Sequence, residues 1–281
     1  MTPIRVAILD MYNNEPNQGM RCIKEIVDAF DLPFEWKVYN VRAENEVPDS
    51  SYDIYISSGG PGNPHEGNGV WDKNWFHLIE NLWQHNQNTS DKKKYVFFIC
   101  HSFQMACIHF KIGTVGLRRS TAFGVFPTHK TNVGMHDPLL RNMPEPYYVV
   151  DSRNWQVTQP DQKVLQQIGA EVLSLEKIRL HVDLERAVMA IRFSDEFFGT
   201  QYHPEADAQG MLQHFQVAEK KQYVINTFGE QKYQDMLNAL RDPEKIMLTH
   251  QTILPGFLRH ATTLLRQQCC QGQDRRVCQS S

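Results

Sequence analysis

The sequence has no long hydrophobic run and no marked excess of charge of either sign. Among its 281 residues, 29 Lys and Arg stand against 32 Asp and Glu, which gives a formal net charge of −3. No apolar stretch reaches the ~18 residues that a membrane-spanning helix needs, and residues 1–14 lack the cleavage site of a signal peptide. The near-neutral balance also disfavours a broad nucleic-acid-binding surface. We therefore expect a protein that binds neither membranes nor nucleic acid.

Cysteines are few, and their spacing shows no disulfide framework. The chain has 6 Cys, and three of them stand in the closing segment CCQGQDRRVC, without a neighbouring His pair. His65, His129 and His136 show no metal-ligand spacing with Cys or carboxylates, so we expect no metal site and no cofactor. Cysteine usage of this kind is typical of a reducing compartment, which indicates the cytoplasm.

The first half of the chain alternates strand and helix patterns. Residues 4–9 and 95–99 are short apolar runs that predict strands, and apolar residues recur at helical spacing between such runs. This rhythm indicates an α/β fold with a central, mostly parallel sheet flanked by helices. Ligands of such sheets bind at the carboxyl ends of the strands.

The second half adds two predicted strands and then becomes helical. Strands are expected at 188–193 and 197–202, and helical patterns follow at 217–240 and 244–265. We expect an α/β domain over residues 1–215, a helical C-terminal extension over 216–268 and a disordered tail over 269–281. The extension could close over a site, dock a partner or cap the sheet.

Cys100 directly follows the predicted buried strand at 95–99 and opens a predicted helix. This strand–turn–helix context is that of a nucleophile elbow, which raises a side chain above the sheet edge at a helix N-terminus. Unpaired N–H groups and the helix dipole favour a thiolate there. On local context alone, Cys100 could equally be a small buried apolar residue.

Two other segments favour the catalytic interpretation of Cys100. His203 and Glu205 follow a predicted strand, and a His near a Cys can take its proton while a carboxylate orients the imidazole. Residues 58–61, Ser-Gly-Gly-Pro, also follow a predicted strand. Their glycines let backbone N–H groups approach an oxyanion closely.

In this order the three segments resemble the motifs of the class I (triad) glutamine amidotransferases. The S-G-G-P loop, the G-x-C-x-G-x-Q elbow and the H-P-E motif of that family correspond to residues 58–61, 100–104 and 203–205, within a resemblance that spans roughly residues 4–215. It implies that Cys100 is the nucleophile, that His203 is the base and that Glu205 orients the base.

The same resemblance implies the remaining parts of the site. The backbone N–H groups of Gly60 and His101 would form the oxyanion hole, and Gly59 and Gln104 would contact the substrate. The implied reaction is hydrolysis of the glutamine side-chain amide through a cysteine thioester, as in the glutaminase half of GMP synthase. The helical extension is too short for a synthetase module, so a separate partner protein would bind the ammonia acceptor.

The chain departs from the family pattern at the elbow. Phe98 and Ser102 occupy positions where the family has glycine. Neighbouring side chains must therefore accommodate bulk around the strained nucleophile.

A second resemblance is to the homoserine trans-succinylases, whose elbow also lacks the flanking glycines. Ser152 and Arg153 match a Ser-Arg pair of that family, and residues 207–209 match its Asp-Ala-Gln stretch. This resemblance implies acyl transfer from an acyl-CoA through Cys100, with Ser152 and Arg153 binding the substrate, although Arg153 could also be a solvated loop residue. The double glycine of residues 58–61 favours the amidotransferase. A non-catalytic relative that binds a partner is a third hypothesis, which the intact triad disfavours.

Overall fold

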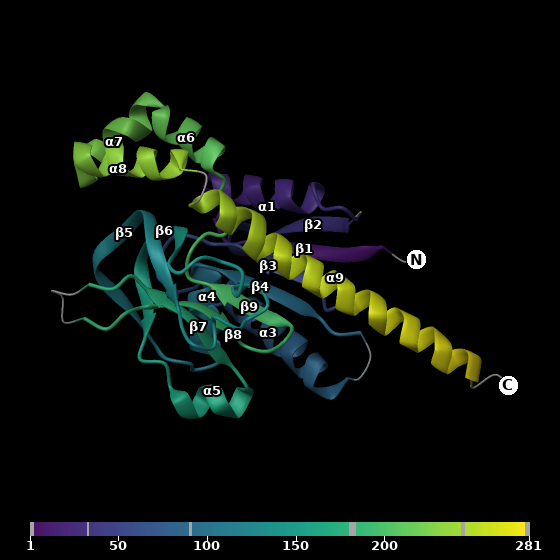
Figure 1. Ribbon diagram of the computed structural model, residues 1–281. Helices are drawn as coiled ribbons and strands as arrows, with labels where there is room; N and C mark the ends of the chain where they lie inside the picture. Colours follow the sequence, from purple (N-terminus) through teal and green to yellow (C-terminus); the bar gives the residue numbers. More distant parts are fainter. Residues whose placement is uncertain (1–2, 33, 90–91, 180–183, 243–244, 279–281) are drawn as a thin grey trace.

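The computed structural model describes residues 3–32, 34–89, 92–179, 184–242 and 245–278, and its strands form a nine-stranded sheet (Figure 1). The strands are β1 (Ile4–Asp10), β2 (Phe34–Asn40), β3 (Ile54–Ser57), β4 (Tyr95–Ile99), β5 (Thr114–Lys130), β6 (Tyr147–Thr158), β7 (Glu171–Glu176), β8 (Val188–Arg192) and β9 (Phe197–Thr200). The helices are α1 (Gln18–Asp28), α2 (Val41–Glu44), α3 (Trp71–Asn88), α4 (His101–His109), α5 (Gln162–Ile168), α6 (Ala208–Gln216), α7 (Ala218–Phe228), α8 (Glu230–Arg241) and α9 (Ile246–Cys278).

The sheet has a parallel half and an antiparallel half. Its order is β2-β1-β3-β4-β9-β8-β7-β5-β6. Strands β2, β1, β3, β4 and β9 are parallel, whereas β8, β7, β5 and β6 pair antiparallel. The predicted α/β fold with a central sheet and C-terminal helices is confirmed, but the sheet is mixed rather than mostly parallel. The long strands β5 and β6 pair with each other antiparallel, which needs no crossover helix between them.

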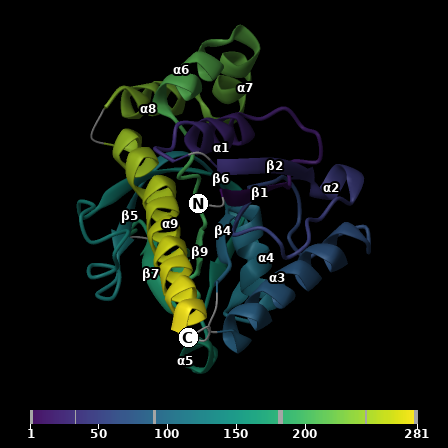
Figure 2. The same cartoon turned by 90° about the vertical axis from the view of Figure 1, so that its right-hand side faces the viewer.

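Side chains on the parallel strands alternate between two buried faces, as a doubly covered sheet requires. Val6 and Ile8 of β1 belong to a core shared with α1 and α9. Ala7 and Leu9 of the same strand belong to a second core shared with α3 and α4. Figure 2 shows α9 crossing one face of the sheet while α3 and α4 cover the other.

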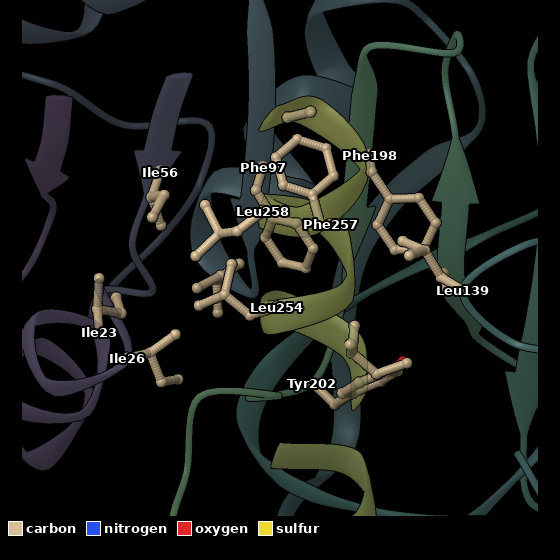
Figure 3. Packing of buried hydrophobic residues seen from close by; sticks show 14 of the residues in the cluster. Ile23, Ile26, Ile56, Phe97, Leu139, Phe198, Tyr202, Leu254, Phe257 and Leu258 are labelled. Carbon is tan, nitrogen blue, oxygen red and sulfur yellow. The ribbon is translucent and has the colours of Figure 1, made fainter. Parts of the chain in front are cut away.

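The C-terminal helices cover the sheet in two ways. Helices α6, α7 and α8 pack together in a small separate core, to which Val150 of β6 also belongs. Helix α9 instead lies on the first core, where Phe257 meets Phe97 edge-on with ring centroids 5.1 Å apart (Figure 3). Of the roles considered for the extension, α9 caps the sheet. It continues past residue 268 to Cys278, through most of the expected tail, and 279–281 lie outside the described residues.

Within the described part of the chain, no helix has both the length and the apolar content to cross a bilayer.

Candidate active site

Cys100 occupies a sharp turn between β4 and α4. Its backbone angles, φ 47° and ψ −96°, are unusual for a residue with a side chain. The backbone N–H of Cys100 donates to the carbonyl oxygen of Thr200 at 2.8 Å, which fixes the turn to β9. This conformation matches the nucleophile elbow that the sequence predicts, and such strain is typical of functional residues.

Ser102 connects the elbow to the loop that follows β3. Its hydroxyl donates to the carbonyl oxygen of Ser58 at 2.6 Å and lies 2.7 Å from Oγ of Ser57. The indole N–H of Trp75 donates to Ser57 at 3.0 Å, so the Ser57 hydroxyl is free to donate to Ser102. A serine at the family's glycine position therefore adds hydrogen bonds between the turn at Cys100 and the loop that follows β3.

His203 and Glu205 form a buried pair beyond the end of β9. Nδ1 of His203 lies 2.8 Å from Oε1 of Glu205, whose side chain is fully buried. Burial by itself lowers the pKa of His203, but the negative charges of Glu205 and Cys100 and hydrogen bonds with both raise this pKa well above 6.5. The structure therefore brings the three predicted triad residues together and favours an imidazolium beside Cys100.

Both glycines of the Ser-Gly-Gly-Pro loop occupy positions that exclude a larger residue. A Cβ at Gly59 would lie 2.7 Å from Cε1 of His203, and a Cβ at Gly60 would overlap the carbonyl oxygen of Met11. The loop is also tied to the segment after β1, because the N–H of Met11 donates to Oγ of Ser58 at 2.9 Å. Close packing of this kind holds the loop against the triad base.

His101 is the first residue of α4, so its backbone N–H is one of the donors that a helix leaves unpaired at its start. Its side chain is buried, and Nε2 has no hydrogen-bond partner among the described residues. Burial, followed by the positive charge of Arg42, lowers the pKa of His101 to about 3. The imidazole of His101 is therefore neutral, in contrast to that of His203.

A cavity of about 380 Å³ opens beside the triad. It is lined by four predicted site residues, Gly60, Ser152, His203 and Glu205. Side chains of the C-terminal helices complete its wall, among them Met211, His214, Phe215, Lys220 and Met236. A substrate in this cavity would touch His203, Glu205 and the helical extension.

Two residues of the site were not singled out from the sequence. Tyr12 lines the cavity, and its hydroxyl would lie 3.0 Å from a Cβ at Gly59. Burial, then the charges of Glu205 and Cys100, raise the pKa of Tyr12, so its hydroxyl stays protonated. Gln201 directs its amide N–H toward Sγ of Cys100 at 3.9 Å. Tyr12 and Gln201 follow β1 and β9, at the carboxyl ends of parallel strands, and this position could have identified them as site residues from the sequence.

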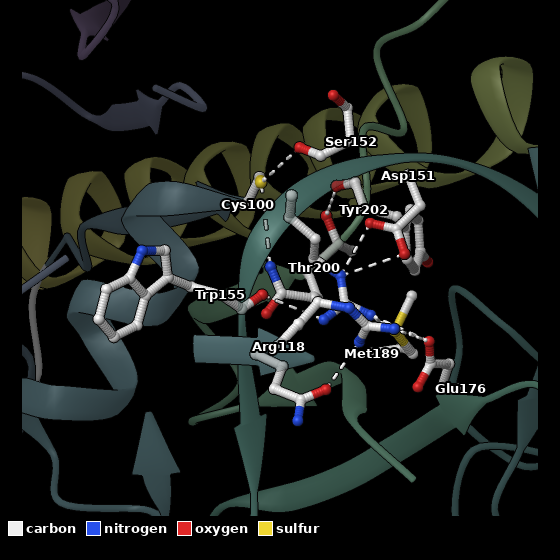
Figure 4. A network of polar contacts seen from close by, with 12 residues as sticks. Cys100, Arg118, Asp151, Ser152, Trp155, Glu176, Met189, Thr200 and Tyr202 are labelled. Carbon is white, nitrogen blue, oxygen red and sulfur yellow. Dashed lines mark hydrogen bonds and ion pairs between the residues drawn. The ribbon is translucent and has the colours of Figure 1, made fainter. Parts of the chain in front are cut away.

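Gln104 and Ser152, two of the predicted substrate contacts, lie near Cys100. The amide N–H of Gln104 donates to the carbonyl oxygen of Trp155 at 3.2 Å and to Oε1 of Gln201 at 3.3 Å. The carbonyl oxygen of Ser152 lies 3.9 Å from Sγ of Cys100 (Figure 4). Gln104 is buried and oriented by these bonds, whereas Ser152 faces the cavity.

Arg153 does not fit one of the two roles that the sequence suggested for it. Its Nε donates to Asp151 at 2.8 Å, and its Nη2 lies 3.6 Å from Glu176, which also pairs with Arg118 at 2.8 Å (Figure 4). Its side chain is 1% exposed and does not line the cavity. Arg153 is therefore paired with two buried carboxylates and is not a solvated loop residue, and its predicted substrate contact stays a prediction.

The Asp-Ala-Gln stretch also has a structural role. Asp207 caps the N-terminus of α6 by accepting from the N–H of Gly210, and its carboxylate pairs with Arg21 of α1. An Asp at this position stabilises the start of a helix. Two of the residues that suggested an acyltransferase, Arg153 and Asp207, therefore form ion pairs that hold elements of the fold together around the site.

The sequence model of the glutamine amidotransferase class-I family matches residues 19–216, and the chain belongs to that family. No curated protein matches the chain in sequence.

Solved structures with the same fold include two glutamine amidotransferases. One, from Thermotoga maritima, has a TM-score of 0.64 and 14% identity, over 94% of this chain and 99% of that one. The other, from Methylobacillus flagellatus, has a TM-score of 0.63 and 13% identity, over 95% and 94% of the two chains. A candidate GMP synthase subunit from Thermoplasma acidophilum has a TM-score of 0.51 and 14% identity, over 73% and 86%. At these identities the likeness is one of fold.

Proposed function

We propose that this chain hydrolyses the side-chain amide of glutamine to glutamate and ammonia through a thioester at Cys100. The observation that carries the proposal is the arrangement of the triad. Cys100 stands in an elbow at a helix N-terminus, and His203 hydrogen-bonds to the buried Glu205 and lies near enough to Cys100 for the charge of that residue to raise its pKa. A cysteine, a base and an orienting carboxylate in this arrangement perform nucleophilic catalysis at amide carbonyls.

The chemical steps follow from the positions of these groups. The thiolate of Cys100 attacks the amide carbon, and a C–S bond forms while the oxygen becomes an oxyanion. The N–H groups of Gly60 and His101 stabilise that oxyanion. His203 protonates the leaving ammonia as the C–N bond breaks, and then activates the water that hydrolyses the thioester. Glu205 stabilises the imidazolium during both steps.

Substrate contacts are proposed for Gly59 and Ser152, and a positioning role is proposed for Gln104. Ser152 lines the cavity, and Gly59 packs against His203, which also lines it. Gln104 acts through Gln201, whose amide N–H lies near the nucleophile.

The ammonia acceptor is proposed to bind to a separate protein. The described residues after 216 are helices that pack on the sheet and on β6, so they do not form a synthetase domain of their own. Ammonia would then leave through the cavity that the C-terminal helices border.

Glutamate release from glutamine tests the proposed reaction. The wild-type chain should release glutamate, and Cys100→Ala should release none while its thermal unfolding stays cooperative. Cys107→Ala is the matched control, because Cys107 is a buried cysteine of α4 that lies in the core and does not line the cavity. A Cys100→Ala variant that still releases glutamate would contradict the proposal.

A further inference from the structure

Strand β6 is the last strand of the sheet, so one of its edges has no partner strand in the described part of the chain. Carbonyl groups two residues apart in a strand point to the same edge. Tyr148, Val150 and Ser152 of β6 show this spacing, and each of their carbonyl oxygens faces a polar group from outside the sheet.

The polar groups that face these carbonyls come from the nucleophile, the base and α9. Sγ of Cys100 lies 3.9 Å from the carbonyl oxygen of Ser152. The backbone N–H of His203 donates to Val150 at 2.9 Å. The hydroxyl of Thr249, near the start of α9, donates to Tyr148 at 2.6 Å. The edge of β6 therefore aligns two triad residues and is itself bonded to the C-terminal helix.

His250, the next residue of α9, reaches the third member of the triad. Its Nδ1 lies 2.9 Å from the backbone carbonyl oxygen of Glu205. A carbonyl oxygen can only accept, so Nδ1 of His250 carries the proton. Oε2 of Glu205 is buried and has no partner in the described residues, and its other oxygen bonds His203. The hydrogen bond from His250 to the backbone of Glu205 is thus a main constraint on the position of Glu205.

We propose that Thr249 and His250 are positioning residues, which means that α9 holds the residues of the triad in their catalytic arrangement. Both residues lie beyond residues 19–216, the segment that the family model matches. This inference rests on the proposed function, because it assigns Thr249 and His250 to the reaction of Cys100. Thr249 holds β6, and with it His203 and Cys100, while His250 holds the backbone of Glu205.

Displacing a catalytic group by about 1 Å can cost on the order of 100-fold in rate, whereas substrate binding depends less on such a shift. Thr249→Val and His250→Leu should therefore lower kcat for glutamate release by at least about tenfold, with KM changed by less than about threefold. His250→Asn places an amide N–H near the position of Nδ1 and should restore most of the lost kcat.

Thr262→Val is the matched control for damage to the helix. Thr262 and Thr249 are both 3% exposed and both belong to α9, but the Thr262 hydroxyl bonds Leu258 of its own helix. Thr262→Val should therefore keep the wild-type kcat, even if it lowers the unfolding temperature as much as Thr249→Val does.

The kinetic and unfolding measurements are made on the full chain. A wild-type kcat in Thr249→Val and His250→Leu would overturn the inference. So would an equal loss of kcat in Thr262→Val, or an inactive His250→Asn that unfolds at the wild-type temperature. Each of these results would leave the proposed function standing, whereas a wild-type chain that releases no glutamate would overturn both.

Discussion

Phe98 and Gly199 face each other across the parallel strands β4 and β9. A Cβ at Gly199 would lie 3.2 Å from Cβ of Phe98 and 2.8 Å from the ring of Phe103. Phe98 stands where the family elbow has glycine, and the glycine on the neighbouring strand supplies the missing space. The neighbouring strand β9 therefore makes room for the ring of Phe98, and the turn at Cys100 stays closed.

Gly199→Ala should lower the free energy of unfolding by about 1–3 kcal/mol, because the added methyl group overpacks the core below the elbow. Urea unfolding measures the change. Gly116→Ala is the control, since a Cβ at Gly116 would meet no atom within 4 Å. An equal loss of stability in the two variants would contradict the role assigned to Gly199.

Glu205→Gln should make the stability of the protein less dependent on pH in the alkaline range. Because the folded pKa of His203 is raised, its contribution to stability is complete below the unfolded pKa of about 6.5 and is lost as pH rises through the folded pKa. The stability advantage of the wild type over Glu205→Gln should therefore shrink as the pH rises above about 6.5. Urea unfolding across this range measures it, and a constant difference would refute the charge coupling between Glu205 and His203.

His101→Gln should flatten the acid side of the stability profile. The pKa of His101 is about 3 in the folded chain and about 6.5 unfolded, so the neutral folded side chain costs stability as pH falls below 6.5. One such group contributes a slope of at most about 1.4 kcal/mol per pH unit. The variant should lose that slope in acid unfolding, whereas His77→Gln on the exposed face of α3 should keep it. Identical acid profiles for wild type and His101→Gln would disprove the burial effect.

Arg153→Met should destabilise the chain without impairing glutamine binding. Removing the guanidinium leaves Asp151 without its ion-pair partner at 2.8 Å, and breaking a buried pair costs about 3–5 kcal/mol. The double variant Asp151→Asn, Arg153→Met should lose less stability than Arg153→Met alone. Unfolding and steady-state kinetics distinguish the roles, since a higher KM at unchanged stability would identify Arg153 as a substrate contact.

The sequence predicts the triad because its signals are local. Cys100 directly follows a buried strand, and the residues around His203 follow another, so parallel strands are enough to bring them to one edge. The fold class follows from the same alternation of strand and helix. Strands β5, β6 and β7 were not predicted from the sequence, because their antiparallel pairing depends on contacts between segments that are far apart in the chain.

The other residues of the site contact one another in the fold but are far apart in the sequence. His250 is 45 residues from Glu205 and lies in a helix with weak periodicity, so nothing in the local pattern links the two. Arg153 shows the converse case. Its motif suggested a ligand contact, but the carboxylates that neutralise it come from its own strand and from β7.

The most direct test of the central claim is the mass of the intact chain after incubation with a glutamine-mimicking diazoketone, followed by peptide mapping. Cys22 lines the cavity beside His203 and Glu205. Because burial raises the pKa of the Cys22 thiol to about 12, this residue should stay unmodified. A parallel incubation with succinyl-CoA should leave no acyl group. We predict one adduct, on Cys100, which is lost in Cys100→Ala. An adduct on Cys22, or an acyl group on Cys100 from succinyl-CoA, would contradict the account.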